Sequence, residues 1–200
     1  MSRYDYNLQL DYAEVWKRAV VAYQEICDRC NDVRISIEFK PTHETSRFSI
    51  VPSTGAALLL VDEINRENMG LTLDVGHLLM AGENPAQSIS MAAERHKLFG
   101  IQLGDGHQRL GAEDGLAFAS VHTTSALEIV FWLQYYNRTE LQVYFDTFPK
   151  NEDPVREAEH NIRRFRSLWA RASKLEELGI RERMEEHDAM GVLEILEKVE

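Results

Sequence analysis

The sequence predicts an α/β fold of about four parallel βα units, which is half of an eight-stranded barrel, followed by a C-terminal helical extension. Short strand-like runs alternate with longer runs of helical spacing, an order typical of a parallel sheet. Only four strand runs occur, whereas an eight-stranded barrel needs about 250 residues. Half a barrel leaves two strand edges and one sheet face uncovered. It must therefore pair with something, cover itself or belong to a longer parent.

The first part of the chain contains two helices and two strands. Residues 11–30 place apolar side chains at helical spacing, and residues 33–39 read as a strand. A polar loop over 42–49 comes next, and a second amphipathic helix covers 53–67. A short strand over 71–75 then completes the first full βα repeat.

The middle of the chain repeats this pattern. After a loop through Gly82, a helix begins at Pro85, which suits a first helical turn, and ends near His96. Residues 98–103 form the third strand. A long Gly-rich loop over 104–115 follows it, at the edge where a parallel sheet carries its functional loops.

The C-terminal part contains the last strand and its helices. A helix over 123–137 begins at Thr123 and Thr124, which are suitable capping residues. The fourth strand covers 141–145 and a helix over 153–172 follows. We expect residues 1–172 to form the half-barrel domain and residues 173–200 to form a charged helical tail.

Composition restricts the class of protein. The apolar content of 44% is enough for a core, and no apolar run approaches the 18 residues of a membrane span. The N-terminus lacks the apolar run of a signal peptide. Cys27 and Cys30 form a C-x-x-C without a second pair, so we expect reduced thiols rather than a zinc site. These features predict a cytoplasmic protein.

The net charge of −11 argues against a nucleic-acid partner, because phosphate binding needs a basic surface. It suits a protein in which some carboxylates are metal ligands and many others lie on solvated helical faces.

Polar side chains stand at the C-terminal end of every predicted strand. They are Glu38 and Lys40, then Asp74 with His77, then Gln102, and finally Asp146. The carboxyl ends of parallel strands meet at one edge, and oxygen ligands from neighbouring strands can converge there on one hard or borderline cation.

Each of these residues also has a structural interpretation. Asp146 taken alone would most often be a helix N-cap, and His77 a hydrogen-bonded core histidine. Glu38 could pair with Lys40 or Arg34. A series of four at equivalent strand ends favours a site for a metal or polar ligand.

Several segments, in order over roughly residues 10–170, resemble the motifs of xylose isomerases. Residues 37–44 (Ile-Glu-Phe-Lys-Pro-Thr-His-Glu) resemble the family's E-x-K-P-x-x-E strand. Residues 70–77 with 80–82 resemble the next metal strand, in which the family has Glu at the position of Asp74. The remaining matches are 97–103 with a third strand, 113–118 with an acidic loop, and 145–146 followed by 152–153 with the last metal strand. L-rhamnose isomerases and ketose 3-epimerases share this layout.

This resemblance implies a TIM barrel with the activity of a cytosolic, often oligomeric sugar isomerase that uses Mn²⁺, Mg²⁺ or Co²⁺. The chemistry would be aldose–ketose interconversion by a hydride shift or through an enediol. A first metal would be held by Glu38, Asp74, Gln102 and Asp146, and a second by Asp74, His77 and Glu113. Lys40 would polarise the sugar carbonyl, and His77 would bind the second metal or the substrate. His43 and His107, in loops of the same face, are candidate sugar-binding residues.

Three departures from the family pattern limit this implication. Gln102 stands where the family has Asp or His, and Gly115 where the second site expects Asp, although Asp114 is adjacent. The change at residue 102 predicts a weaker first site, and the change at residue 115 favours a single metal. The first four βα units of the family have no counterpart here.

Alternatives therefore stay open. The chain could be an inactive barrel fragment that serves as an interaction subunit, or a ketose 3-epimerase. Its expected partners are a sugar together with either a second copy or a missing N-terminal half-barrel. An apurinic-site endonuclease of the same barrel class is disfavoured, because it needs more strand-end histidines and a basic face.

Overall fold

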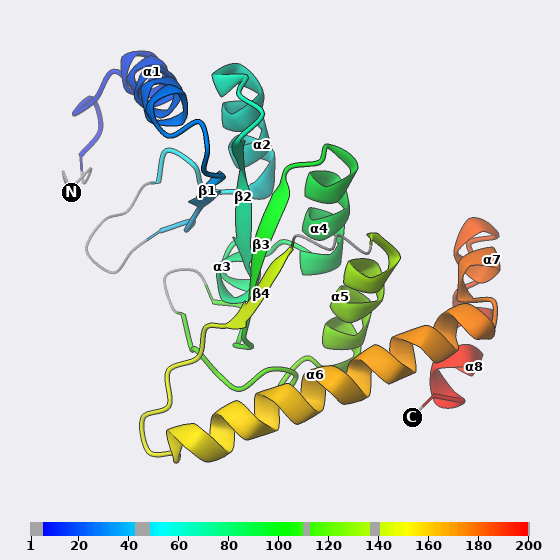
Figure 1. Ribbon diagram of the computed structural model, residues 1–200. Coiled ribbons are helices and arrows are strands. Elements are labelled where there is room, and N and C mark those ends of the chain that lie inside the picture. The colour runs from blue at the N-terminus through cyan, green and yellow to red at the C-terminus, as the bar shows by residue number, and fades with distance from the viewer. Residues whose placement is uncertain (1–5, 43–48, 110–112, 137–140, 200) are drawn as a thin grey trace.

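The computed structural model describes residues 6–42, 49–109, 113–136 and 141–199, and it contains one four-stranded parallel sheet (Figure 1). The strands lie in the order of the chain and are β1 (Ile35–Glu38), β2 (Met69–Asp74), β3 (Leu98–Leu103) and β4 (Gln142–Phe145). All three pairings are parallel. This confirms the predicted α/β class and the open, half-barrel sheet.

Helices connect and follow the strands. They are α1 (Tyr12–Arg29), α2 (Thr54–Ile64), α3 (Val75–Met80), α4 (Pro85–Glu94), α5 (Thr123–Tyr136), α6 (Pro154–Glu177), α7 (Ile180–Glu185) and α8 (Ala189–Glu197). The helix α3 occupies part of a segment predicted as a loop. The helix α6 runs without a break past residue 172, so the predicted domain boundary falls inside it, and the division into two domains stays a prediction. Within the described ranges, none of the helices is long and apolar enough to pass through a membrane.

The core lies between the sheet and the helices on one of its faces. Figure 1 shows α2, α4 and α5 side by side along this face. The strand residues Leu71, Leu73, Ile101 and Leu103 are fully buried there. Burial of large aliphatic side chains contributes about 1.5–3 kcal/mol each, so this face supplies much of the stability of the sheet.

The strand side chains that point away from this core are polar. In β1, Ile37 is buried while Ser36 and Glu38 are exposed, which is the two-residue alternation of a strand. The Ser36 and Thr72 hydroxyls lie 2.7 Å apart across the β1–β2 pair. Asp74 is the register partner of Gln102. The strands therefore present a polar face that leads to the predicted site.

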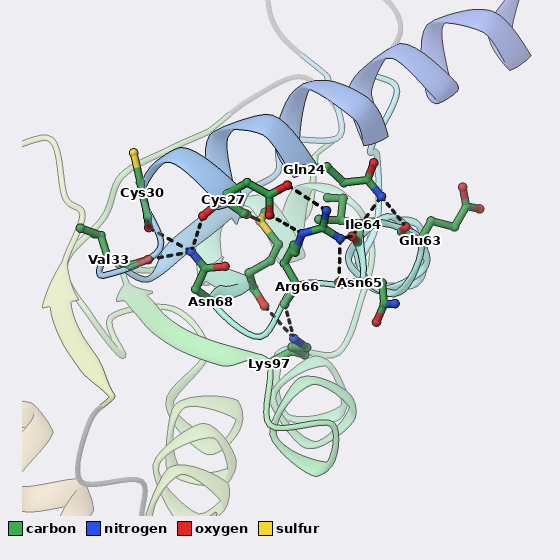
Figure 2. Close-up of polar contacts among 12 residues, drawn as sticks. Gln24, Cys27, Cys30, Val33, Glu63, Ile64, Asn65, Arg66, Asn68 and Lys97 are labelled. Atoms are coloured by element: carbon green, nitrogen blue, oxygen red, sulfur yellow. Dashed lines mark hydrogen bonds and ion pairs between the residues drawn. The ribbon is translucent and has the colours of Figure 1, made fainter.

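A separate polar network ties the N-terminal ends of the strands to α1 (Figure 2). The Asn68 side-chain amide donates to the carbonyls of Cys27, Cys30 and Val33, each at 3.1 Å. The Lys97 ammonium donates to the carbonyls of Arg66 and Met69, both at 3.0 Å. These groups satisfy main-chain acceptors where α1 and α2 end and β2 begins, which is a structural role.

Candidate metal centre

The ends of β1, β2 and β4 and the loop after β3 deliver charged side chains to the same edge of the sheet. Glu38, Asp74 and His77 have ligand atoms within 4.8 Å of one another, and so do Asp74, Glu113 and Asp146. Asp74 belongs to both groups. The structure thus brings together the predicted residues Glu38, Asp74, Asp146, His77 and Glu113.

Asp74 is the buried centre of this cluster, with 4% of its surface exposed. Its Oδ1 accepts a hydrogen bond from the His77 main-chain N–H at 2.8 Å and so caps α3. Burial raises the pKa of Asp74 to about 6, against the opposing effect of His77, and nearby Glu113 and Asp146 add to the rise. A cation bound beside Asp74 would favour its ionised form and offset the cost of burying that charge.

His77 is oriented by the main chain of the neighbouring strand end. Its Nδ1 lies 2.9 Å from the Phe39 carbonyl oxygen, which can only accept, so Nδ1 carries a proton. Its Nε2 lies 3.3 Å from Glu113 Oε2. Burial lowers the pKa of His77, but the hydrogen bond to Glu113 and the charge of Asp74 outweigh it and raise the pKa. In neutral His77 the Nε2 lone pair faces carboxylate oxygen, an arrangement that a proton or a metal ion stabilises.

Glu113 comes from the loop after β3 and is bound by two cationic side chains. Its Oε2 accepts from the Lys40 ammonium as well as from His77. The hydrogen bond from His77, opposed by burial and reinforced by Lys40, lowers the pKa of Glu113 to about 2. Lys40 therefore pairs with Glu113. The structural interpretation of Glu38 had offered Lys40 as a partner of Glu38 instead.

Gln102 provides a test of whether the site suits a cation. Its Nε2 donates to Glu38 Oε2 at 3.1 Å, while its Oε1 is buried without a hydrogen-bond partner in the described part of the chain. An orphaned buried acceptor is costly. The oxygen-rich donor set around it is the kind that Mn²⁺ or Mg²⁺ prefers, so the residues fit a divalent cation.

The acidic loop departs from the family pattern for a steric reason. Gly115 has φ +62°, and a Cβ there would lie 2.2 Å from Phe148 Cδ2, so an aspartate does not fit. Asp114 does not replace it. Its oxygens accept from the Arg109 guanidinium and, at 2.6 Å, from the His107 main-chain N–H.

The two loop histidines remain predictions as sugar-binding residues. His43 lies outside the described residues. His107 is exposed, and its main chain holds Asp114.

Asp105, one of the polar residues that follow the third strand, anchors the loop that carries Glu113, a role that the sequence did not predict. Asp105 is buried and accepts from the main-chain N–H groups of Gly106, Val121 and His122. It also bonds His122 Nδ1 at 2.8 Å. This carboxylate, rather than Thr123 or Thr124, holds the turn into α5, since the Thr123 hydroxyl bonds the Ala119 carbonyl.

The main-chain carbonyl of Phe39 and the ring of Phe148 were also missed, and neither has a signal of its own in the sequence. Gly76 does have one, in Asp-Val-Gly-His. A Cβ at Gly76 would lie 3.0 Å from Asp74 Oδ1 and 3.6 Å from Glu113 Cγ, so glycine permits the close approach of these two side chains.

Solved structures with the same fold include sugar epimerases. An L-ribulose 3-epimerase superposes with a TM-score of 0.65 at 16% identity, over 82% of this chain and 57% of its own. A D-psicose 3-epimerase from Clostridium cellulolyticum, solved with D-tagatose, gives 0.60 at 16%, over 83% and 60%. An IolI protein with a bound zinc atom gives 0.56 at 21%, over 84% and 60%. The chain thus spans less than two thirds of the length of each of these barrels.

The family model that describes the xylose isomerase-like TIM barrel matches residues 2–127, more than half of the chain. The matched region contains β1 to β3, together with Glu38, Asp74, His77, Gln102 and Glu113. With the parallel sheet and the strand-end cluster, this match shows that the chain belongs to the xylose isomerase-like TIM barrel family.

Proposed function

We propose that this chain supplies the metal-binding half of a sugar isomerase that interconverts an aldose and a ketose. The observation that carries the proposal is the pair of strand-end clusters that share the buried Asp74, at the edge of the sheet that also holds Lys40 and His77. The same edge carries Gln102, whose buried Oε1 has no hydrogen-bond partner in the described part of the chain. Structural ion pairs alone do not account for such an acceptor.

Glu38, Asp74, Gln102 and Asp146 would hold the cation, which we expect to be Mn²⁺, Mg²⁺ or Co²⁺. Such a cation supplies Lewis acidity that polarises the sugar carbonyl. The IolI structure, with its bound zinc, supports a metal in this fold.

The chain's own side chains would then bind the open-chain sugar and move its proton. The Lys40 ammonium, partly exposed beside the cluster, would donate a hydrogen bond to the carbonyl oxygen. Glu38 keeps 40% of its side chain exposed and lies next to Gln102, so it would take a proton from C2 of an aldose and return it to C1, while the proton of O2 passes to O1. His77, fixed by the Phe39 carbonyl, would hold Glu113 or a sugar hydroxyl in place.

Epimerisation of a ketose at C3 is the second candidate, and the solved 3-epimerases of the same fold favour it. The same carboxylates would remove a proton at C3 and return it to the opposite face. The two candidates differ in the carbon that exchanges hydrogen.

The test is incubation of the Mn²⁺-loaded chain with a panel of aldoses and ketoses in ²H₂O, followed by NMR. Deuterium at C1 or C2 with aldose–ketose conversion supports isomerisation by proton transfer, and conversion without deuterium supports a hydride shift. Deuterium at C3 with inversion supports the epimerase. Asp74→Asn should abolish any of these, and exposed Glu186→Gln should not. Tight Mn²⁺ binding without turnover would favour the interaction subunit instead.

We also propose that the working protein is an oligomer located in the cytosol. The sheet ends at β1 and β4, and the chain spans only 57–60% of the three compared barrels, so the strands of a second copy, or of a missing N-terminal half-barrel, would complete the barrel. The thiols of Cys27 and Cys30 are both free, and a reducing compartment keeps them so.

A further inference from the structure

The Glu113 carboxylate already has two cationic neighbours, and both contact the same oxygen. The Lys40 ammonium and His77 Nε2 each bond Glu113 Oε2. Glu113 is well shielded, with 10% of its side chain exposed, and Asp74 lies within 4.8 Å of it. The ammonium group thus occupies the Glu113 oxygen that also faces His77, and Glu113 lies beside Asp74. Glu113, His77 and Asp74 are the three residues that would bind a second metal.

The described residues of the surrounding loop, 104–109 and 113–115, do not supply a further ligand at this position. Phe148 fills the space that a side chain at residue 115 would need, and the Phe148 N–H bonds the Gly115 carbonyl at 2.8 Å. Asp114 is turned toward Arg109 and the His107 main chain. A second divalent ion would have to displace Lys40 and use three ligands, one of them shared with the first ion.

We propose that the Lys40 ammonium takes the place of the second metal, so that the chain binds one divalent cation and keeps a fixed positive charge beside it. This inference rests on the metal site proposed above and concerns its stoichiometry.

Charge supports a single ion. With Lys40 and His77 as the two cationic neighbours of Glu113, the four carboxylates leave two uncompensated negative charges, and one divalent cation removes both. A second divalent cation held together with Lys40 would leave excess positive charge in a partly buried site, which is unfavourable. Removing Lys40 reverses this balance and frees Glu113 and His77 as ligands.

The experiment is a Mn²⁺ titration of the full chain after chelator treatment, with stoichiometry from calorimetry and ion–ion coupling from electron paramagnetic resonance. The wild-type chain should bind one uncoupled Mn²⁺. Lys40→Met should bind two, with a coupled spectrum and a weaker second ion, whereas Lys40→Arg should stay at one. Lys40→Met combined with Glu113→Gln should return to one ion, because the second site loses its carboxylate. The exposed Lys150→Met is the matched control and should also bind one.

Each other outcome has a definite meaning. Two coupled ions in the wild-type chain, or a single ion in folded Lys40→Met, would overturn the inference and leave the proposed metal site standing. Circular dichroism shows whether each variant is folded. If the methionine variant is not, the wild-type chain still provides the test, because two coupled ions overturn the inference and a single uncoupled ion supports it. The absence of any Mn²⁺ binding to the folded wild-type chain would refute the metal site itself, and the inference with it.

Discussion

Asp74 shows how a single residue of the site opposes the stability of the metal-free fold. Its pKa is raised to about 6 by burial, from 3.8 in an unfolded chain. The raised value means that the folded state holds the proton more tightly. The contribution of protonated Asp74 to the free energy of unfolding is therefore fully present below pH 3.8 and is lost as pH rises through 6. At neutral pH, ionised Asp74 lowers the free energy of unfolding by about 3 kcal/mol relative to low pH.

We therefore expect Asp74→Asn to stabilise the metal-free chain by up to about 3 kcal/mol at pH 8 and by little near pH 4, because asparagine stays neutral and can still cap α3. Urea denaturation in the presence of chelator at several pH values measures this. The exposed Asp32→Asn should show no such pH dependence. An equal effect of Asp74→Asn at all pH values would contradict the assignment.

Gly115 provides a second prediction at the residue scale. Gly115→Ala should destabilise the fold by about 1–3 kcal/mol, since the new Cβ meets Phe148 and the residue keeps φ +62°. Gly82→Ala separates the two causes, because Gly82 has φ +72° with open space around it. Thermal unfolding should therefore place Gly115→Ala below Gly82→Ala. Equal losses would show that the contact with Phe148 carries no energy.

At the scale of elements, the two ends of the strands have different tasks. The C-terminal ends carry the carboxylate cluster, whereas the N-terminal ends carry the network of Asn68 and Lys97 shown in Figure 2. In α/β barrels the first end serves chemistry and the second serves stability. The helix α3 starts directly after Asp74. It therefore places His77 within one turn of the C-terminal end of β2, beside the carboxylate cluster.

Asn68→Ala tests this division. The substitution leaves the carbonyls of Cys27, Cys30 and Val33 without this donor, so we expect a loss of about 1–3 kcal/mol in the free energy of unfolding. Chemical denaturation measures the loss, and calorimetry should find Mn²⁺ affinity within a few-fold of wild type. A large fall in affinity with unchanged stability would place this network in the functional site.

At the scale of the whole molecule, the sheet formed by the described residues is open at both sides. β1 and β4 are its outer strands, and Val143 and Tyr144 on β4 are 42% and 43% exposed. Exposed strand edges with apolar side chains favour pairing with another chain. This supports the proposal that the protein is an oligomer.

We expect sedimentation to show self-association of the wild-type chain and a weakening of at least tenfold for Val143→Lys, because a buried lysine at a strand edge opposes pairing. Met190→Lys is the control, since Met190 on α8 is 65% exposed and distant in sequence from the edge strands. A wild-type monomer, or equal weakening by both variants, would argue against β4 as the contact.

Much of the fold could be predicted because its signals are local. The strand 98–103 and the helix starting at Pro85 agree with β3 and α4, since apolar periodicity and capping residues act over a few neighbours. The segment of α3 was predicted as a loop because a six-residue helix is too short to show a period. The end of α6 was misplaced by five residues because its helical pattern continues past residue 172 as far as Gly179, which follows the C-cap Leu178 and has φ +75°.

The sequence by itself determined the class of the fold and the residues that could reach the site, because strand alternation and the parallel βα order bring strand ends to one edge. Only the tertiary structure decided which of these residues meet. The pairing of Lys40 with Glu113, the unpartnered Oε1 of Gln102 and the contact of Phe148 with Gly115 join residues that are far apart in the chain. Such contacts depend on distances of a few ångströms between side chains, which no local pattern encodes.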